Sequence, residues 1–234
     1  MFEGSYTALV TPFRDGRVDY EALEALIHRQ AEAGIDGIVP VGTTGESPTV
    51  DSSEHIEIIK RAVEFSAGRL KVVAGTGANA TSEAIHLTGE AEQAGADGSL
   101  QVCPYYNKPS QEGIYHHFRS VAESSSLPLM LYSVPGRSVI DIAVDTVARL
   151  ARDCKTVVCI KEAGGSSDRV NKLVQAVPDG FTILSGDDPL TVPFMSVGAA
   201  GVVSVAANLI PEIIARQVEA ALAGSFDEAL RLQR

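Results

Sequence analysis

The chain has 234 residues, of which 45% are hydrophobic and 21% are charged, and its formal net charge is -11 at pH 7. A chain of this length and composition can build one sizeable hydrophobic core, and its length alone allows one or two domains. The negative charge argues against duplex nucleic acid and anionic membrane surfaces as partners, because binding to either needs clustered lysine and arginine.

The cysteines and the N-terminal residues indicate where the protein resides. Cys103, Cys154 and Cys159 are odd in number and widely spaced, which is typical of free thiols in a reducing compartment. The N-terminus has no basic segment followed by a long apolar run, so no signal peptide is expected. No stretch approaches the roughly 20 apolar residues of a membrane span. We therefore expect a soluble cytoplasmic protein.

The first half of the chain alternates between apolar runs and amphipathic helical patterns. Apolar runs that predict strands lie at residues 4–13, 36–42, 71–77 and 98–104. Helical patterns follow them at residues 20–34, 52–65, 80–95 and 110–124. Asp51 is the expected N-cap of the second helix, and Gly95 is the expected stop of the third. Several apolar runs are continuous rather than alternating, as expected of parallel strands buried on both faces.

The second half of the chain continues the same alternation. Strands are predicted at residues 128–134, 156–162, 181–186 and 201–206, and helices at 143–152, 168–177, 189–198 and 211–223. Eight strand–helix units predict a (β/α)8 TIM barrel, a fold that typically needs about 250 residues. A doubly wound open sheet is the alternative, but the element order shows no reversal typical of that fold. We assign residues 1–224 to the barrel.

Lys161 is the first candidate for chemistry, because active sites of such barrels lie at the C-terminal ends of the strands. The alternation of side chains along a strand places Lys161 on the same face as Cys159 and Val157. If that face is the barrel lumen, loss of water lowers the lysine pKa from about 10.4 toward the range of 7–8. A neutral amine can then attack a ketone and form a Schiff base. The alternative is a structural salt bridge with a neighbour such as Glu162.

Tyr132 lies near the end of the preceding predicted strand and shares a face with Met130. Its phenol could move protons to and from a carbinolamine on Lys161, although a core tyrosine with a satisfied hydroxyl is the common alternative. Thr43 and Thr44 lie between two glycines, in a turn whose amides and hydroxyls could bind a carboxylate or simply form a polar turn.

Arg137 follows in a Pro-Gly loop, where it could bind a second carboxylate or remain a solvated surface residue. No metal or cofactor is expected. The five histidines all fall in helical stretches without a metal-binding spacing, and the dinucleotide-like segment at 75–80 has no acidic residue at the end of the next strand.

Seven motifs taken together resemble one family. The segments GTTGES, GTGANATSEAI, CPYYNKPSQEG, YSVPGRS, IKEAGG, SGDD and GVVSVAAN occur in the order and spacing of the dihydrodipicolinate synthases, and the resemblance covers essentially the whole chain. These enzymes belong to the pyruvate-dependent lyases, a superfamily that also contains N-acetylneuraminate lyase. The implied reaction is the condensation of pyruvate with aspartate semialdehyde through a covalent imine, in the diaminopimelate route to lysine.

The resemblance also implies roles for particular residues. Lys161 resembles the Schiff-base lysine, and Tyr132, Thr43 and Tyr106 resemble a proton relay in which the neighbouring subunit of a homodimer or homotetramer supplies Tyr106. Thr44, together with Thr43, resembles the site for the pyruvate carboxylate. Further positions correspond to the arginine that binds the semialdehyde carboxylate and to the backbone of the pyruvate pocket: Arg137, Gly186 and Val203.

A site for lysine as an effector is also implied, at His55, Asn79, Glu83 and Tyr105, although Ser52 and Pro48 depart from the pattern of strongly inhibited members. Residues 225–234 resemble the start of the family's C-terminal helical domain, with an apolar stripe left uncovered at Phe226, Ala229 and Leu230.

Three departures keep other functions open. Ser133 stands where the synthases usually have asparagine, RSVID lacks a common glycine, and EAGG replaces EASG. One alternative is another pyruvate-dependent class I aldolase, of the 4-hydroxy-2-oxoglutarate or N-acetylneuraminate type. The other is an inactive homologue that acts as a binding or assembly protein.

Overall fold

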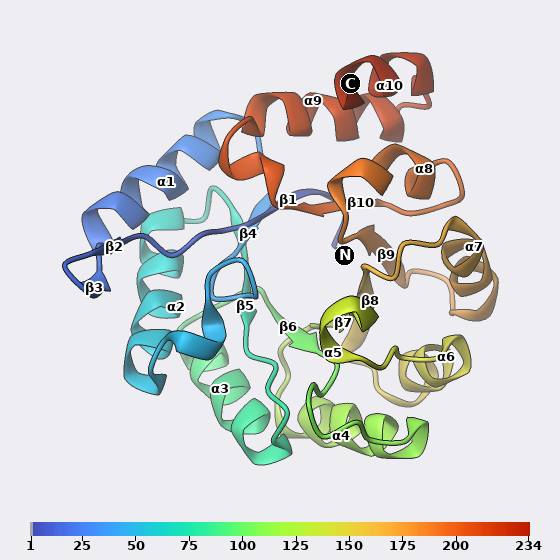
Figure 1. Ribbon diagram of the computed structural model, residues 1–234, viewed down its shortest axis with the longest axis horizontal. Coiled ribbons are helices and arrows are strands. Elements are labelled where there is room, and N and C mark those ends of the chain that lie inside the picture. The colour runs from blue at the N-terminus through green and yellow to red at the C-terminus, as the bar shows by residue number, and fades with distance from the viewer. Residues whose placement is uncertain (1) are drawn as a thin grey trace.

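Eight parallel strands close into a barrel in the computed structural model, which describes residues 2–234 (Figure 1). Around the barrel the strands follow the order β1-β10-β9-β8-β7-β6-β5-β4. Each barrel strand therefore pairs with the barrel strands before and after it in the chain, and the ring closes between β1 and β10. Their bounds are Gly4–Ala8 (β1), Gly37–Val39 (β4), Lys71–Gly75 (β5), Gly98–Val102 (β6), Leu129–Ser133 (β7), Val157–Glu162 (β8), Thr182–Ser185 (β9) and Gly201–Ser204 (β10). The predicted (β/α)8 barrel is confirmed.

Helices surround the barrel at the predicted places (Figure 1). They span Tyr20–Glu32 (α1), Ser52–Ser66 (α2), Thr81–Gln93 (α3), Gln111–Ser124 (α4), Val144–Asp153 (α6), Ser167–Ala176 (α7), Thr191–Met195 (α8) and Pro211–Leu222 (α9). The Asp51 side chain caps α2 by accepting from the backbone N–H groups of Ser53 and Glu54, as predicted. Gly95 follows the end of α3 with φ at +85°, a conformation that favours glycine.

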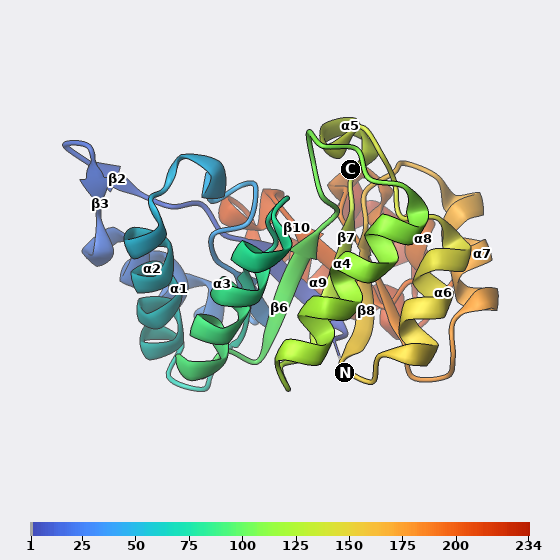
Figure 2. The same cartoon turned by 90° about the horizontal axis from the view of Figure 1, so that it is seen from below.

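Short elements that the sequence pattern did not predict occupy the loops that follow the strands. They are a hairpin of Phe13–Arg14 (β2) and Arg17–Val18 (β3), a short helix Pro135–Ser138 (α5), and 3-10 turns at Ser47–Thr49, Asp188–Leu190 and Ala206–Asn208. The predicted first strand was therefore too long, because β1 ends at Ala8. Figure 2 shows α5 at one end of the barrel and the N-terminus at the other, so α5 lies on the C-terminal rim.

Side chains fill the lumen of the barrel. The buried lumen cluster consists of Phe2, Tyr6, Ala8, Val39, Val73, Leu100, Met130, Tyr132, Val134, Cys159, Leu184 and Val203. The predicted shared face of Tyr132 and Met130 is confirmed. The prediction for Val157 was wrong, because the β7–β8 register shifts between Leu129 and Met130, and Val157 packs in the helix-facing core instead. Such an irregularity reverses the alternation of side chains beyond it.

The last helix, Phe226–Gln233 (α10), packs back on the barrel. Ala229 is fully buried and Phe226 is partly buried, whereas Leu230 is 43% exposed, so the expected uncovered stripe is only partly uncovered. Gln233 accepts from Gln217 Nε2 of α9 at 2.9 Å. The boundary between residues 224 and 225 stays a prediction. Within residues 2–234, no helix is long and apolar enough to cross a membrane.

Candidate active site

Lys161 lies in the barrel lumen near the C-terminal end of β8. Only 5% of its surface is exposed, and its Nζ atom lies 4.2 Å from the centre of the Tyr132 ring. The two residues are direct partners in the parallel β7–β8 register. Because residues aligned across neighbouring parallel strands point to the same face of the sheet, this register brings the amine and the phenol together.

The pKa of Lys161 is lowered to about 8, because burial, together with the positive charge of Arg137, disfavours the charged amine more than the negative charge of Asp188 favours it. A lysine with this pKa is partly neutral near pH 8, and the neutral amine is the nucleophile required for Schiff-base formation. The alternative of a salt bridge with Glu162 does not hold. Glu162 pairs instead with Arg169 of α7, at 2.9 Å, on the opposite face of the strand.

Gly186 leaves room for the lysine side chain. A Cβ atom at this position would lie 2.9 Å from Cε of Lys161 and 2.9 Å from Cβ of Ala163. The backbone N–H of Gly186 donates to the carbonyl oxygen of Glu162 at 2.8 Å, which keeps the turn close to the end of β8. Val203 of β10 is fully buried in the lumen cluster.

Tyr132 is also buried, and burial raises the pKa of its phenol. A hydrogen bond with the Thr43 side chain and the positive charge of Arg137 both act in the opposite direction. A phenol linked to a neighbouring hydroxyl in this way can pass a proton along the pair. The structure therefore brings Lys161, Tyr132 and Thr43 into one cluster.

The turn that carries Thr43 and Thr44 follows β4 and is tightly packed. The Thr11 hydroxyl donates to the carbonyl oxygen of Gly45 at 2.7 Å, and a Cβ atom at Gly45 would approach the carbonyl oxygen of Leu9 to 3.0 Å. Glycine is therefore required for the close approach at this turn. Both threonines are partly exposed, as a binding role requires.

Arg137 lies on α5 and lines a cavity together with Thr43. A cavity of about 240 Å³ is lined by Thr43, Ser47, Pro48, Gly77, Val102, Tyr105, Val134, Arg137 and Ser138. The arginine is exposed and its charge acts on both Lys161 and Tyr132. A permanently charged guanidinium in the lining of a small cavity suits a ligand that carries a carboxylate.

Tyr106 is not packed into this cluster within the single chain. It lies on the loop after β6, its side chain is 87% exposed, and its φ is +72°. A tyrosine with positive φ is uncommon and is often found where a side chain has a functional position.

A second cavity lies beside the first and contains all four residues of the predicted effector site. It has a volume of about 310 Å³ and is lined by Ser47, Pro48, Val50, Ser52, His55, Gly77, Ala78, Asn79, Glu83, Leu87 and Tyr105. The His55 Nε2 atom lies 2.7 Å from the carbonyl oxygen of Gly75, so Nε2 is the donor, and burial lowers the pKa of this imidazole. Ser47, Pro48, Gly77 and Tyr105 line both cavities.

Asp188 is a residue of the site that sequence reasoning did not single out. Its charge acts on Lys161, and its Oδ2 atom accepts from the backbone N–H groups of Val205 and Ala206, both at 3.0 Å. The signal was available, because the SGDD segment follows a predicted strand. Across residues 2–234, no group of three or more His, Cys, Asp or Glu side chains is placed so that it could hold a metal ion.

Comparisons with known proteins identify the family of this chain. The model of the dihydrodipicolinate synthetase family matches residues 1–234. The 4-hydroxy-tetrahydrodipicolinate synthase of Persephonella marina is 55% identical over 232 residues, which are 99% of this chain and 79% of that protein. The structure of the same enzyme from Methylacidiphilum fumariolicum superimposes with a TM-score of 0.98 at 56% identity, covering 100% of this chain and 78% of that one.

Two further solved structures contain ligands. The synthase of Cyanidioschyzon merolae with lysine bound has a TM-score of 0.96 at 43% identity, covering 99% of this chain and 80% of that one. The synthase of Acinetobacter baumannii complexed with pyruvate has a TM-score of 0.97 at 43% identity, covering 100% and 80%. The family predicted from the seven motifs is confirmed, and the chain belongs to the dihydrodipicolinate synthetase family.

Proposed function

We propose that this chain is a lyase that condenses pyruvate with aspartate semialdehyde to give 4-hydroxy-tetrahydrodipicolinate, through an imine on Lys161. The observation that carries the proposal is the buried Nζ atom of Lys161, 4.2 Å from the Tyr132 ring centre, with a pKa lowered to about 8. The relatives that match nearly the whole chain carry the name of this enzyme.

In the first half of the reaction, the neutral amine of Lys161 attacks the ketone carbon of pyruvate and forms a carbinolamine. Loss of water gives the imine, and loss of a proton from the methyl group gives the enamine. Tyr132 and Thr43 move these protons, because the phenol and the hydroxyl form a hydrogen-bonded pair beside the amine. Thr43 and Thr44 hold the pyruvate carboxylate.

In the second half, the enamine carbon attacks the aldehyde carbon of the semialdehyde, and the aldehyde oxygen takes up a proton. The amino group of this second substrate then attacks the imine carbon and displaces Lys161 as the ring closes. Arg137 binds the carboxylate of the semialdehyde at the mouth of the cavity. Gly186 and Val203 form the wall of the pyruvate pocket, as their places beside the lysine and in the lumen suggest.

The departure at Ser133 does not favour an aldolase with another substrate. Ser133 is fully buried, and its hydroxyl accepts from the backbone N–H of Ile142 at 3.3 Å, outside the lumen. It therefore faces away from the cavity in which the aldehyde would bind. Arg137 is retained at the cavity and favours a second substrate that carries a carboxylate.

We further propose that the protein is a cytoplasmic homodimer or homotetramer in which Tyr106 completes the proton relay of a neighbouring subunit. The 87% exposure of this tyrosine supports a role in an interface, and three buried free thiols fit a reducing compartment. We propose that lysine binds as an effector in the cavity that contains His55, Asn79, Glu83 and Tyr105.

The test combines covalent trapping with substrate choice. Borohydride reduction in the presence of pyruvate should attach the pyruvate carbons to Lys161, as read by peptide mass spectrometry. A coupled assay should then show turnover with aspartate semialdehyde but not with N-acetylmannosamine or glyoxylate. Absence of an adduct would favour the inactive homologue, and turnover of either alternative aldehyde would favour an aldolase.

A further inference from the structure

The segment that follows Arg137 is held by side chains from several elements. We call residues 139–143, which connect α5 with α6, the strap. Val139 begins it with φ at +69°, a strained conformation for a β-branched residue, and is 62% exposed. Strain of this kind persists only where the surroundings hold it. The contacts of the strap therefore contribute to holding the end of α5, the helix that carries Arg137.

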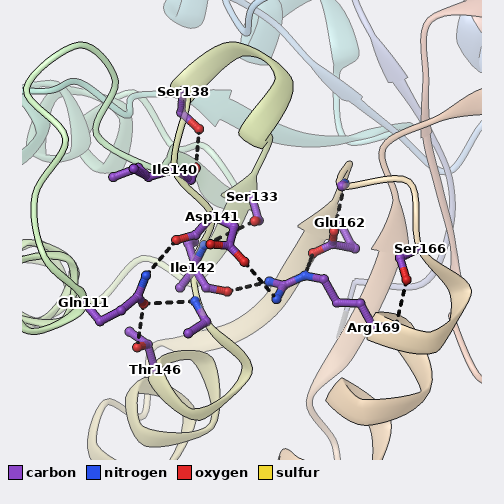
Figure 3. A network of polar contacts seen from close by, with 12 residues as sticks. Gln111, Ser133, Ser138, Ile140, Asp141, Ile142, Thr146, Glu162, Ser166 and Arg169 are labelled. Carbon is purple, nitrogen blue, oxygen red and sulfur yellow. Dashed lines mark hydrogen bonds and ion pairs between the residues drawn. The ribbon is translucent and has the colours of Figure 1, made fainter.

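One side of the strap is held by Gln111 at the start of α4. Its Nε2 atom donates to the carbonyl oxygen of Asp141 at 2.9 Å, and its Oε1 atom accepts from the backbone N–H of Ala143 at 2.9 Å. The same Oε1 atom accepts from the Thr146 hydroxyl at 2.7 Å. Gln111 thus fixes two peptide groups of the strap from the helix side (Figure 3).

The other side of the strap is held by Arg169 of α7, which lies between the strap and β8 (Figure 3). Its Nη2 atom donates to the carbonyl oxygen of Ile142, and its Nη1 atom lies 3.5 Å from a carboxylate oxygen of Asp141. Its Nε atom donates to Oε2 of Glu162 at 2.9 Å. The planar guanidinium therefore joins three acceptors that a lysine could not reach together.

Glu162 connects this contact to the reacting lysine. It follows Lys161 directly in β8, is 0% exposed, and accepts from the backbone N–H of Gly164 at 2.8 Å through its second oxygen. Arg169 is only 16% exposed. A buried pair of this kind adds little stability over apolar side chains of similar size, so its presence calls for a role other than stability.

We propose that Arg169 is a positioning residue that sets the distance between the two substrate sites, by linking β8, which carries Lys161, to the strap that follows α5 and Arg137. The inference rests on the proposed function, because it assigns the semialdehyde carboxylate to Arg137. Arg169 touches no substrate. It fixes the strap against β8, and so it determines where the carboxylate of the second substrate is held relative to the enamine.

The test replaces Arg169 and measures the two substrates separately. Arg169→Met should lower kcat/KM for aspartate semialdehyde by about 10- to 100-fold, the loss expected for a misplacement of about 1 Å. The rate of imine trapping with pyruvate should stay within about twofold. Arg169→Lys should restore little of the loss, because the ammonium group cannot join the acceptors at once. Lys172→Met is the matched control, since this exposed cation on the same helix pairs with Asp168 one turn away.

A double-mutant cycle distinguishes positioning from a general structural role. If Arg169 acts through Arg137, then Arg169→Met should change semialdehyde use by less than about twofold in an Arg137→Ala background. The proposal would be overturned if the losses in semialdehyde use caused by the two substitutions multiplied in the double variant. It would also be overturned if Arg169→Met lowered imine trapping and semialdehyde use equally. If Arg169→Met does not fold, Gln111→Ala decides, because this exposed residue holds the same strap and should give the same pattern. Unchanged semialdehyde use in that variant would also overturn it.

Failure of the proposed function has a different signature. The unmodified protein would then form no imine with pyruvate, or would not use aspartate semialdehyde, and both proposals would fall together. A loss of semialdehyde use that is confined to the Arg169 and Gln111 variants supports the positioning role of Arg169. Unaltered kinetics in all of these variants would overturn that role without affecting the proposed reaction.

Discussion

The packing of Gly186 against Lys161 allows a prediction that separates activity from stability. In a Gly186→Ala variant, the new methyl group would lie 2.9 Å from Cε of Lys161 and from Cβ of Ala163. Carbon atoms normally approach to about 3.5–4.0 Å, so each contact is too short by roughly 0.6–1.1 Å. The end of the lysine side chain can move, whereas Ala163 is fixed to the backbone at the end of β8.

We expect the lysine to yield, and the amine to move away from the Tyr132 ring by about 1 Å. A displacement of this size costs about 100-fold in rate. Overpacking costs about 1–3 kcal/mol in stability, and each kcal/mol corresponds to a fall of about 2–4 °C in Tm for a domain of this size. The variant should therefore stay folded at room temperature and lose most of its imine-forming activity.

The assay is the rate of borohydride trapping with pyruvate, measured beside a thermal melt. Gly89→Ala is the matched control, because a Cβ atom at this helical glycine has nothing within 4 Å. That variant should trap pyruvate normally and be slightly more stable, by about 0.5–1 kcal/mol. A folded Gly186→Ala protein that traps pyruvate within about twofold of the normal rate would refute the packing argument.

Two further predictions concern the phenol and the second cavity. Tyr132→Phe keeps the ring beside the amine but removes the hydroxyl that forms a hydrogen bond with Thr43, so turnover should fall by about 10²–10⁴-fold while the melting temperature changes little. Tyr115→Phe, on α4 and outside the site, is the control. Equal kinetics in the two variants would contradict a role of Tyr132 in the proton relay. Glu83→Gln removes a carboxylate from the cavity that contains His55 and should weaken lysine binding by about tenfold or more, as measured by isothermal titration calorimetry. Glu90→Gln, on the same helix, is the control and should leave lysine binding unchanged. Equal lysine affinity in both variants would show that Glu83 is not part of the effector site.

The sequence was sufficient to predict the barrel because its signals are local and repeated. Continuous apolar runs mark strands that are buried on both faces, and the stripes between them mark helices that cover the barrel. The same periodicity placed Tyr132 on the face of Met130 and Lys161 on the face of Cys159, and the structure confirms both in the lumen.

Other features depend on interactions that the sequence pattern does not contain. The shift in the β7–β8 register between Leu129 and Met130 turns Val157 toward the helices, and no residue in the local sequence predicts this shift. The partner of Glu162 could not be predicted, because Arg169 lies on the following helix and meets it only when α7 packs on the barrel. The alternation of side chains along a strand could still have predicted that Glu162 does not pair with Lys161, since it directs the two residues to opposite faces of β8.

The proposed chemistry requires that Lys161 is held out of water, so that its amine is partly neutral under physiological conditions. With a pKa of about 8, roughly 20% of the amine is neutral at pH 7.4, against roughly 0.1% for a solvated lysine, a difference of about 200-fold. The most direct measurement is the initial rate of imine trapping with pyruvate as a function of pH. We expect the rate to rise with pH and to be half-maximal near pH 8. A rate that is still rising steeply above pH 10, as for a solvated lysine, would contradict it.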